Sequence, residues 1–237
     1  MKILAFDSSG MTATVAYLQD ETLVCEYTVN YKKTHSQTLL PMLDEIVQAL
    51  GLDLETIDAI AVSKGPGSFT GLRIGSATVK GLALALNKPV IPVSTLDALA
   101  YNLCGHQGIV CPIMDARRNQ VYTGIYRFEG LALKTVREPS AMGIEDLIAV
   151  LDEIGESTVF LGDGVPVYRD RIDAAMQTAH TFAPPHLAMQ RAGSVASLGA
   201  ILASQGIIQT ADEHVPEYLR VSQAERERAE RMRLEGQ

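Results

Sequence analysis

The stretch GPGSFTGLRIG at residues 65–75 decides the fold assignment. It follows an aliphatic run, Ile57 to Ser63, that is typical of a buried strand, and it opens a predicted helix from Thr70 to Leu86. A glycine-rich turn between a strand and a helix often binds phosphate, because free backbone N–H groups point outward at the start of the helix. The sequence therefore predicts an α/β domain with this turn at one edge.

The turn departs from both common phosphate-binding fingerprints. A dinucleotide loop, G-x-G-x-x-G, needs a third glycine where Thr70 stands, and Gly71 comes one residue late. A P-loop needs a lysine directly after its last glycine, and Leu72 follows instead. We favour a tight turn whose small residues let the helix pack closely, and direct phosphate binding stays the alternative.

Acidic and glycine turns elsewhere in the chain match the places where actin-like ATPases and sugar kinases hold a nucleotide. In those proteins the first acidic turn meets the metal and the phosphates. An ordinary hairpin or strand-to-helix turn is the alternative at each place. The predicted vestigial nucleotide site comprises Asp7, Ser8, Ser9, Asp115, Gly162 and Gly164.

Arg117 and Arg118 fill the turn that opens the second half of the chain. A nucleotide-binding relative would have glycines there, so that its backbone could approach phosphate. Two bulky side chains prevent that approach. We expect the arginines to contact a partner or an anion from outside, with an exposed basic turn as the alternative.

Composition limits the function classes. The net charge is −8, tryptophan is absent and aromatic residues make up 5% of the chain. Proteins that bind RNA without a partner usually have more basic than acidic residues. Proteins that bind single strands use aromatic side chains on which the bases stack. The three cysteines form no CxxC pair, which favours reduced thiols, and no apolar run approaches the ~20 residues of a membrane span. We expect a cytoplasmic protein that does not bind RNA on its own.

No metal site is expected. A helical metal pair needs two histidines at i and i+4, and Leu39 stands four residues after His35. HExxH and nucleophile-elbow motifs are also absent.

The chain is predicted to form two related α/β halves, the second degenerate. Gly105 and Gly108 mark the boundary, giving domains at residues 1–105 and 106–237. A tail from Ala224 to Glu235 alternates Glu and Arg, which is typical of a solvated helix.

Two helices of the first half are predicted to bind a partner. On the helix from Ser36 to Leu50 the apolar arc spans about 160°, wider than the ~100° that covering a sheet requires. The next helix carries glycines four residues apart, which suggests close packing. Packing inside the chain's own core is the alternative. The predicted interface residues are Leu39, Met42, Leu43, Ile46, Leu72, Gly75 and Val79.

Four segments together resemble one family. They are GPGSFTGLRIG at 65–75, THSQTLLP at 34–41, DARRNQVY at 115–122 and YLR at 218–220. They are similar to the TsaB (YeaZ) family, within the TsaD/Kae-like (glycoprotease-like) group. The resemblance covers nearly the whole chain except the charged tail, and implies the actin-like ATPase, sugar kinase and Hsp70 (ASKHA) fold.

The resemblance also implies a function. The partner TsaD would carry the nucleotide and the catalytic metal, and would transfer threonylcarbamoyl from threonylcarbamoyl-AMP to the adenosine next to the tRNA anticodon. This chain would be a non-catalytic subunit without a cofactor of its own. It would bind TsaD and TsaE, meet tRNA only through the complex, and form a homodimer when alone.

Two other functions stay open. An actin-fold kinase or ATPase would need Asp7, Asp115 and the turn at 162–164 to bind Mg-ATP. A glycoprotease-type metallopeptidase would need a metal, and the sequence offers no protease chemistry to support it.

Overall fold

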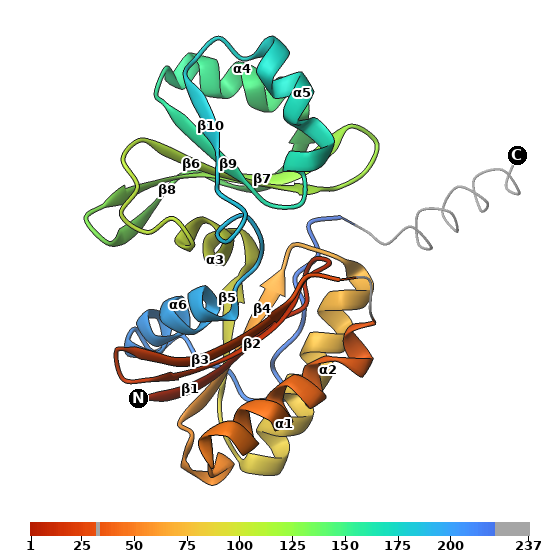
Figure 1. Ribbon diagram of the computed structural model, residues 1–237, viewed down its shortest axis with the longest axis vertical. Coiled ribbons are helices and arrows are strands. Elements are labelled where there is room, and N and C mark those ends of the chain that lie inside the picture. The colour runs from red at the N-terminus through yellow and green to blue at the C-terminus, as the bar shows by residue number, and fades with distance from the viewer. Residues whose placement is uncertain (32–33, 221–237) are drawn as a thin grey trace, which may run out of the picture.

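The computed structural model describes residues 1–31 and 34–220, and the predicted charged tail lies outside them. Two five-stranded mixed sheets form separate layers, one in each half of the molecule (Figure 1). The first sheet has the order β3-β2-β1-β4-β5 and the second the order β10-β9-β6-β7-β8. Both sheets follow the same plan around their first strand, β1 or β6: the next two strands of the chain lie on one side of it and the following two on the other. This equivalence confirms the predicted α/β fold with two related halves.

The first sheet combines an antiparallel meander with two parallel strands. β1 pairs antiparallel with β2 and parallel with β4. The α1 and α2 helices cover one face and α6 covers the other (Figure 1). The elements are β1 (Lys2–Asp7), β2 (Ala13–Gln19), β3 (Thr22–Val29), α1 (Leu39–Leu50), β4 (Ala59–Gly65), α2 (Phe69–Leu86), β5 (Val90–Ser94) and α6 (Ala192–Ser204).

The second sheet repeats this plan. The α4 and α5 helices pack on one face, and α3 packs on the other, between the two sheets (Figure 1). The elements are α3 (Thr95–Tyr101), β6 (Ile109–Asp115), β7 (Gln120–Glu129), β8 (Ala132–Gly143), α4 (Ile144–Ile154), β9 (Thr158–Leu161), α5 (Val165–Ala175) and β10 (His180–Phe182). Short 3-10 helices occupy His35–Gln37 and Leu54–Thr56.

Local capping signals explain several helix ends. Gly51 ends α1 in the left-handed conformation at φ 58°, and the Ser68 and Ser94 side chains accept hydrogen bonds from the first turns of α2 and α3. The predicted helix start at Ser36 is wrong, because that residue lies in the 3-10 turn and α1 begins three residues later, at Leu39.

The apolar faces of α1 and α2 are turned toward the chain's own sheet. The predicted interface residues Leu39, Met42, Leu43, Ile46, Leu72 and Val79 are each no more than 4% exposed. All of them except Leu72 pack with residues of β1, β2 and β4 in one core cluster. Since burying each such side chain stabilises the fold by about 1.5–3 kcal/mol, they are committed to this core. The prediction is corrected accordingly: a partner can reach only the opposite faces of these helices.

The chain returns to the first half after β10. Its α6 helix buries Ala192 and Val195 against Ile3 and Ala61 of the first sheet. Residues 192–204 therefore pack with the N-terminal half, although the sequence division places them in the second domain. None of the helices in the described ranges combines the length and the apolar character that a membrane crossing requires.

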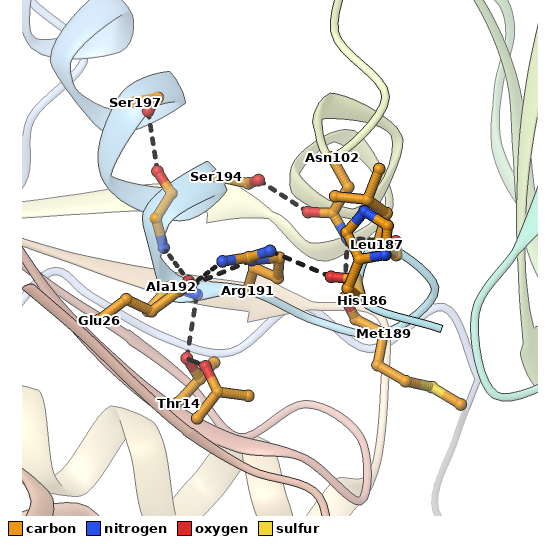
Figure 2. Close-up of polar contacts among 12 residues, drawn as sticks. Thr14, Glu26, Asn102, His186, Leu187, Met189, Arg191, Ala192, Ser194 and Ser197 are labelled. Carbon is orange, nitrogen blue, oxygen red and sulfur yellow. Dashed lines mark hydrogen bonds and ion pairs between the residues drawn. The ribbon is translucent and has the colours of Figure 1, made fainter. Parts of the chain in front are cut away.

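The start of α6 is capped by residues distant in sequence. Figure 2 shows Arg191 directed at Glu26 of β3, and the Nε atom of Arg191 lies 3.0 Å from the Glu26 carboxylate. Glu26 also accepts a 2.8 Å hydrogen bond from the backbone N–H of Gly193, and Thr14 accepts one from Ala192. Asn102 joins the end of α3 to this corner through Ser194 and the loop before α6 (Figure 2).

Candidate functional site

A cavity of about 390 Å³ lies where the two halves meet. The turn after β1, the start of α2, the β6–β7 turn and the segment before residue 221 all contribute to it. Its apolar walls come from Met11, Phe69, Met114, Tyr122 and Tyr218, and its charged groups from Asp115, Arg117, Asp163 and Arg220. This is the cleft in which the sequence predicted a vestigial nucleotide site.

Asp7 at the end of β1 is engaged entirely by its own chain. It is 1% exposed, and its carboxylate accepts hydrogen bonds from the Ser9 N–H at 2.8 Å, the Ser9 hydroxyl at 2.6 Å and the Ser63 hydroxyl at 2.5 Å. Burial raises the pKa of Asp7, and these hydrogen bonds oppose the rise. Asp7 does not line the cavity.

Three glycines of the 65–75 stretch form a packing seam against the first turn. A Cβ atom on Gly67 would lie 2.4 Å from the Ser9 carbonyl oxygen, and one on Gly71 would lie 2.1 Å from the Ser8 carbonyl oxygen. A Cβ atom on Gly75 would lie 2.4 Å from the Ser8 hydroxyl oxygen. The hydroxyl of Ser8 in turn donates a 2.9 Å hydrogen bond to the carbonyl oxygen of Gly71. We call these contacts the glycine seam; they favour the close-packing interpretation of the stretch.

The backbone donors at the start of α2 are also partly used. The Ser68 N–H donates to the Ser9 carbonyl at 2.6 Å, and the Gly71 N–H donates to the Ser68 hydroxyl at 3.2 Å. A phosphate would need such donors to face open space. With the Asp7 carboxylate also engaged by hydroxyls, this arrangement does not fit a Mg-nucleotide.

The β6–β7 turn carries an unusual backbone. Arg117, Arg118 and Asn119 have φ values of 64°, 56° and 59°, a left-handed conformation that residues other than glycine seldom adopt. Asp115 accepts the Arg117 N–H at 2.9 Å and pairs with its guanidinium group at 3.0 Å. The Arg117 side chain is 86% exposed, so it projects into solvent at the cavity rim.

The Asp163 side chain lies next to Asp115 at the base of the β6–β7 turn. Its carboxylate accepts a 3.2 Å hydrogen bond from the Asp115 N–H, and burial raises its pKa. The flanking Gly162 and Gly164 lie against the Ile113 carbonyl oxygen, which their Cβ atoms would approach to 2.3 and 2.9 Å. They do not line the cavity, so the structure favours an ordinary strand-to-helix turn there.

The structure brings together only part of the predicted site. Of its six residues, Ser9 and Asp115 line the cavity, and Arg117 joins them. Sequence reasoning gave no role to Tyr218 and Arg220, which line it too. The YLR segment was a signal for them, but its position in the cleft depends on a return of the chain that no local pattern reveals.

A metal-binding cluster is also absent from the described residues: no three His, Cys, Asp or Glu side chains gather to hold an ion. The His35 Nε2 atom instead donates a 2.9 Å hydrogen bond to the Gly10 carbonyl oxygen.

Comparison with known proteins places this fold. A family model described as TsaD, tRNA N6-adenosine threonylcarbamoyltransferase, matches residues 22–228. A tRNA threonylcarbamoyladenosine biosynthesis protein TsaB from Bacillus subtilis is 34% identical over 95% of this chain and 96% of its own length. The TsaB of Haemophilus influenzae is 41% identical over 52% of each chain.

Solved structures agree with the sequence relatives. YeaZ from Pseudomonas aeruginosa superposes with a TM-score of 0.78 at 28% identity, covering 92% of this chain and 99% of YeaZ. An activator of 2-hydroxyisocaproyl-CoA dehydratase from Clostridium difficile, solved with bound ADPNP, shares the fold alone, with a TM-score of 0.50 at 11% identity over 87% of this chain and 97% of the activator. The matched length and identity show that the chain belongs to the TsaB (YeaZ) family of tRNA threonylcarbamoyladenosine biosynthesis proteins.

Proposed function

We propose that this protein is a non-catalytic, cytoplasmic subunit of tRNA N6-threonylcarbamoyladenosine synthesis. It binds the transferase TsaD and supports transfer of threonylcarbamoyl from threonylcarbamoyl-AMP to the adenosine beside the anticodon. TsaE joins the pair, tRNA meets this subunit through the complex, and a homodimer forms when TsaD is absent. The nucleotide and the metal belong to TsaD.

The observation that carries the non-catalytic role is the glycine seam. The Ser8 turn and the start of α2 touch each other, where a working nucleotide site would leave room for phosphate. Asp7 would have to give up three internal hydrogen bonds to reach a metal ion. Leaving buried hydroxyls without partners costs about 1–3 kcal/mol each, so the closed arrangement is favoured.

The outer face of α2 supports the partner role. Ala77, Gly81, Leu84 and Ala85 are exposed there, and Leu84 is 62% exposed. A Cβ atom on Gly81 would meet nothing within 4 Å, so no contact inside the chain requires a glycine. Glycine lowers the stability of a helix by about 1 kcal/mol relative to alanine. A helix of another protein that packs closely against Gly81 would explain why glycine stands at this position.

The outer face of α1 lies beside this surface. It exposes Leu40 and Pro41, with Asp44, Glu45 and Gln48 further along the helix. We propose that TsaD, or a second copy of this chain, packs on the exposed residues of both helices. We call this surface the outer helix face.

The kinase or ATPase alternative can be tested directly. Isothermal titration of the purified chain with Mg-ATP should give no binding heat, while the chain should still raise the rate of tRNA modification when added to TsaD, TsaE, tRNA and threonylcarbamoyl-AMP. ATP turnover that disappears in Asp7→Ala would instead establish the ATPase. The metallopeptidase alternative requires a bound metal, which elemental analysis of the purified chain would detect.

A further inference from the structure

The segment from Glu217 to Arg220 joins the two halves of the molecule at the cleft. After α6 the chain runs back along the first sheet, where Gln209 pairs with Val90 through two 2.8 Å backbone hydrogen bonds. Further on, the His214 carbonyl accepts a 3.0 Å hydrogen bond from the Lys80 ammonium group. The segment therefore reaches the cleft while held along the first half.

Glu217 fixes the segment to the end of β4. Its N–H donates a 2.6 Å hydrogen bond to the Lys64 carbonyl, and its carboxylate lies 2.6 Å from the Lys64 ammonium nitrogen. The approach is so close that a Cβ atom on Gly65 would lie 2.1 Å from the Glu217 carbonyl oxygen. Gly65 also has a φ of 130°, which only glycine adopts readily. The first glycine of the 65–75 stretch thus makes room for this segment.

Tyr218 fixes the segment to the first turn of α2. Its ring lies against the Phe69 ring, with centroids 4.4 Å apart, and its hydroxyl accepts a 3.2 Å hydrogen bond from the Arg73 Nε. The Arg73 guanidinium group lies 3.9 Å from the Phe69 ring centroid. Aromatic and cation–π contacts of this kind hold a side chain in one orientation.

Arg220 crosses to the second half. Its Nη1 donates a 2.9 Å hydrogen bond to the Ala116 carbonyl, and its Nη2 donates to the Gln120 side-chain oxygen. Ala116 and Gln120 are the residues on either side of the left-handed turn at 117–119. Such a backbone persists only when its surroundings hold it. The Arg220 guanidinium group therefore binds the residues at both ends of the strained turn.

We infer that residues 217–220 are an interdomain latch, which joins α2 to the β6–β7 turn and fixes the position of Arg117 and Arg118. The Tyr218 side chain anchors the latch on the first half, and the Arg220 side chain is its positioning group on the second. This inference does not depend on TsaD binding, because every contact lies within one chain.

Trypsin provides the test, since it cleaves after Arg117 and Arg118 when the turn opens. The full chain would be digested under native conditions as wild type, Arg220→Ala, Tyr218→Ala and Arg137→Ala. Arg137 is an exposed arginine on β8, so its removal controls for the loss of one charge. Fragments ending at residues 117 and 118 would be followed by mass spectrometry.

The latch predicts about tenfold faster cleavage at the turn in Arg220→Ala and Tyr218→Ala, and a wild-type rate in Arg137→Ala. Hydrogen exchange of the Ala116 and Gln120 amides, which donate to the Gln120 and Arg117 carbonyls, should accelerate similarly, while the amides of β1 keep their protection. Wild-type cleavage of Arg220→Ala would overturn the inference. It would also be overturned if the β1 amides lost protection together with the turn, because the segment would then support global stability only.

Discussion

The hydroxyl of Ser8 donates a 2.9 Å hydrogen bond to the carbonyl oxygen of Gly71. This bond joins the first turn of the chain to the helix that follows the glycine-rich stretch. In a working nucleotide site these two elements would stand apart around phosphate; here their backbones touch. The stretch that marks the family is therefore explained in this chain by packing.

The glycine seam predicts a specific coupling between Ser8 and Gly75. Gly75→Ala would place a Cβ atom 2.4 Å from the Ser8 hydroxyl oxygen, and should lower the free energy of unfolding by about 1–3 kcal/mol. Adding Ser8→Ala removes the clashing oxygen, so the double variant should recover part of the loss. Urea unfolding of both single variants and the double variant measures this. Strictly additive effects would mean that the two residues do not compete for space.

The cap on α6 predicts a large effect of the Glu26 carboxylate, whose side chain is 9% exposed. Glu26→Ala would leave the Arg191 guanidinium group and the Gly193 N–H without their acceptor, and should cost about 2–3 kcal/mol in urea unfolding. Glu129→Ala is the matched control, because Glu129 forms only an exposed ion pair with Lys134 at 3.6 Å. The control should change stability by less than about 1 kcal/mol. If the two substitutions lowered stability equally, Glu26 would have no capping role at the start of α6.

His214 predicts acid sensitivity. The ring is 1% exposed, and neither nitrogen has a hydrogen-bond partner among the described residues. Burial, together with Lys80 and Lys64, lowers its pKa from 6.5 to about 4. The folded state disfavours the protonated ring. The stability that the neutral ring contributes is therefore fully present above pH 6.5 and is lost as the pH falls toward about 4.

The variant His214→Leu should therefore lose less stability than the wild type between pH 6.5 and 4. Urea unfolding across this range gives the slope, and the exposed His186→Leu serves as the control. A wild-type slope in His214→Leu would show that other groups cause the acid sensitivity.

Arg117 and Arg118 predict a loss of function without a loss of stability. Both side chains are exposed, and the surface pair of Arg117 with Asp115 is worth no more than about 1 kcal/mol. Replacing both arginines with alanine should leave the melting temperature within a few degrees and lower the rate of reconstituted tRNA modification. Lys134→Ala with Arg137→Ala removes the same charge from β8 as a control. If the reconstituted reaction runs at the wild-type rate with both double variants, the two arginines are exposed residues with no role in the modification.

Local signals predicted much of the first half. The end of α1 at Leu50 was predicted correctly, because the left-handed residue that stops the helix, Gly51, directly follows it in the sequence. The α5 helix was missed because the segment from Val165 to Ala175 has a proline in its first turn and four charged residues that interrupt its apolar pattern. The β8 strand was missed because it is an edge strand whose residues are exposed or half-buried.

The site was harder to predict than the fold. An apolar arc on α1 shows that Leu39 and Ile46 are buried, but it does not show what buries them, and the chain's own sheet does. Contacts such as Arg191 with Glu26, or Arg220 with Ala116, join residues more than 100 positions apart. Only the return of the chain through α6 brings these groups together.

Burial also changes which substitutions can test the partner surface. An arginine at Met42 or Gly75 would be forced into the core, so loss of binding would reflect unfolding. Ala77 on α2 and Ala149 on α4 are both exposed helical alanines, one on the outer helix face and one in the second half. An arginine at either position changes charge and bulk equally and leaves the core intact.

The central claim is that TsaD binds the outer helix face, and its most direct test is isothermal titration of purified TsaD with wild type, Ala77→Arg and Ala149→Arg. Circular dichroism should show all three folded. We predict that Ala77→Arg weakens binding at least tenfold, about 1.4 kcal/mol, while Ala149→Arg binds like the wild type. Wild-type affinity of folded Ala77→Arg would contradict the account.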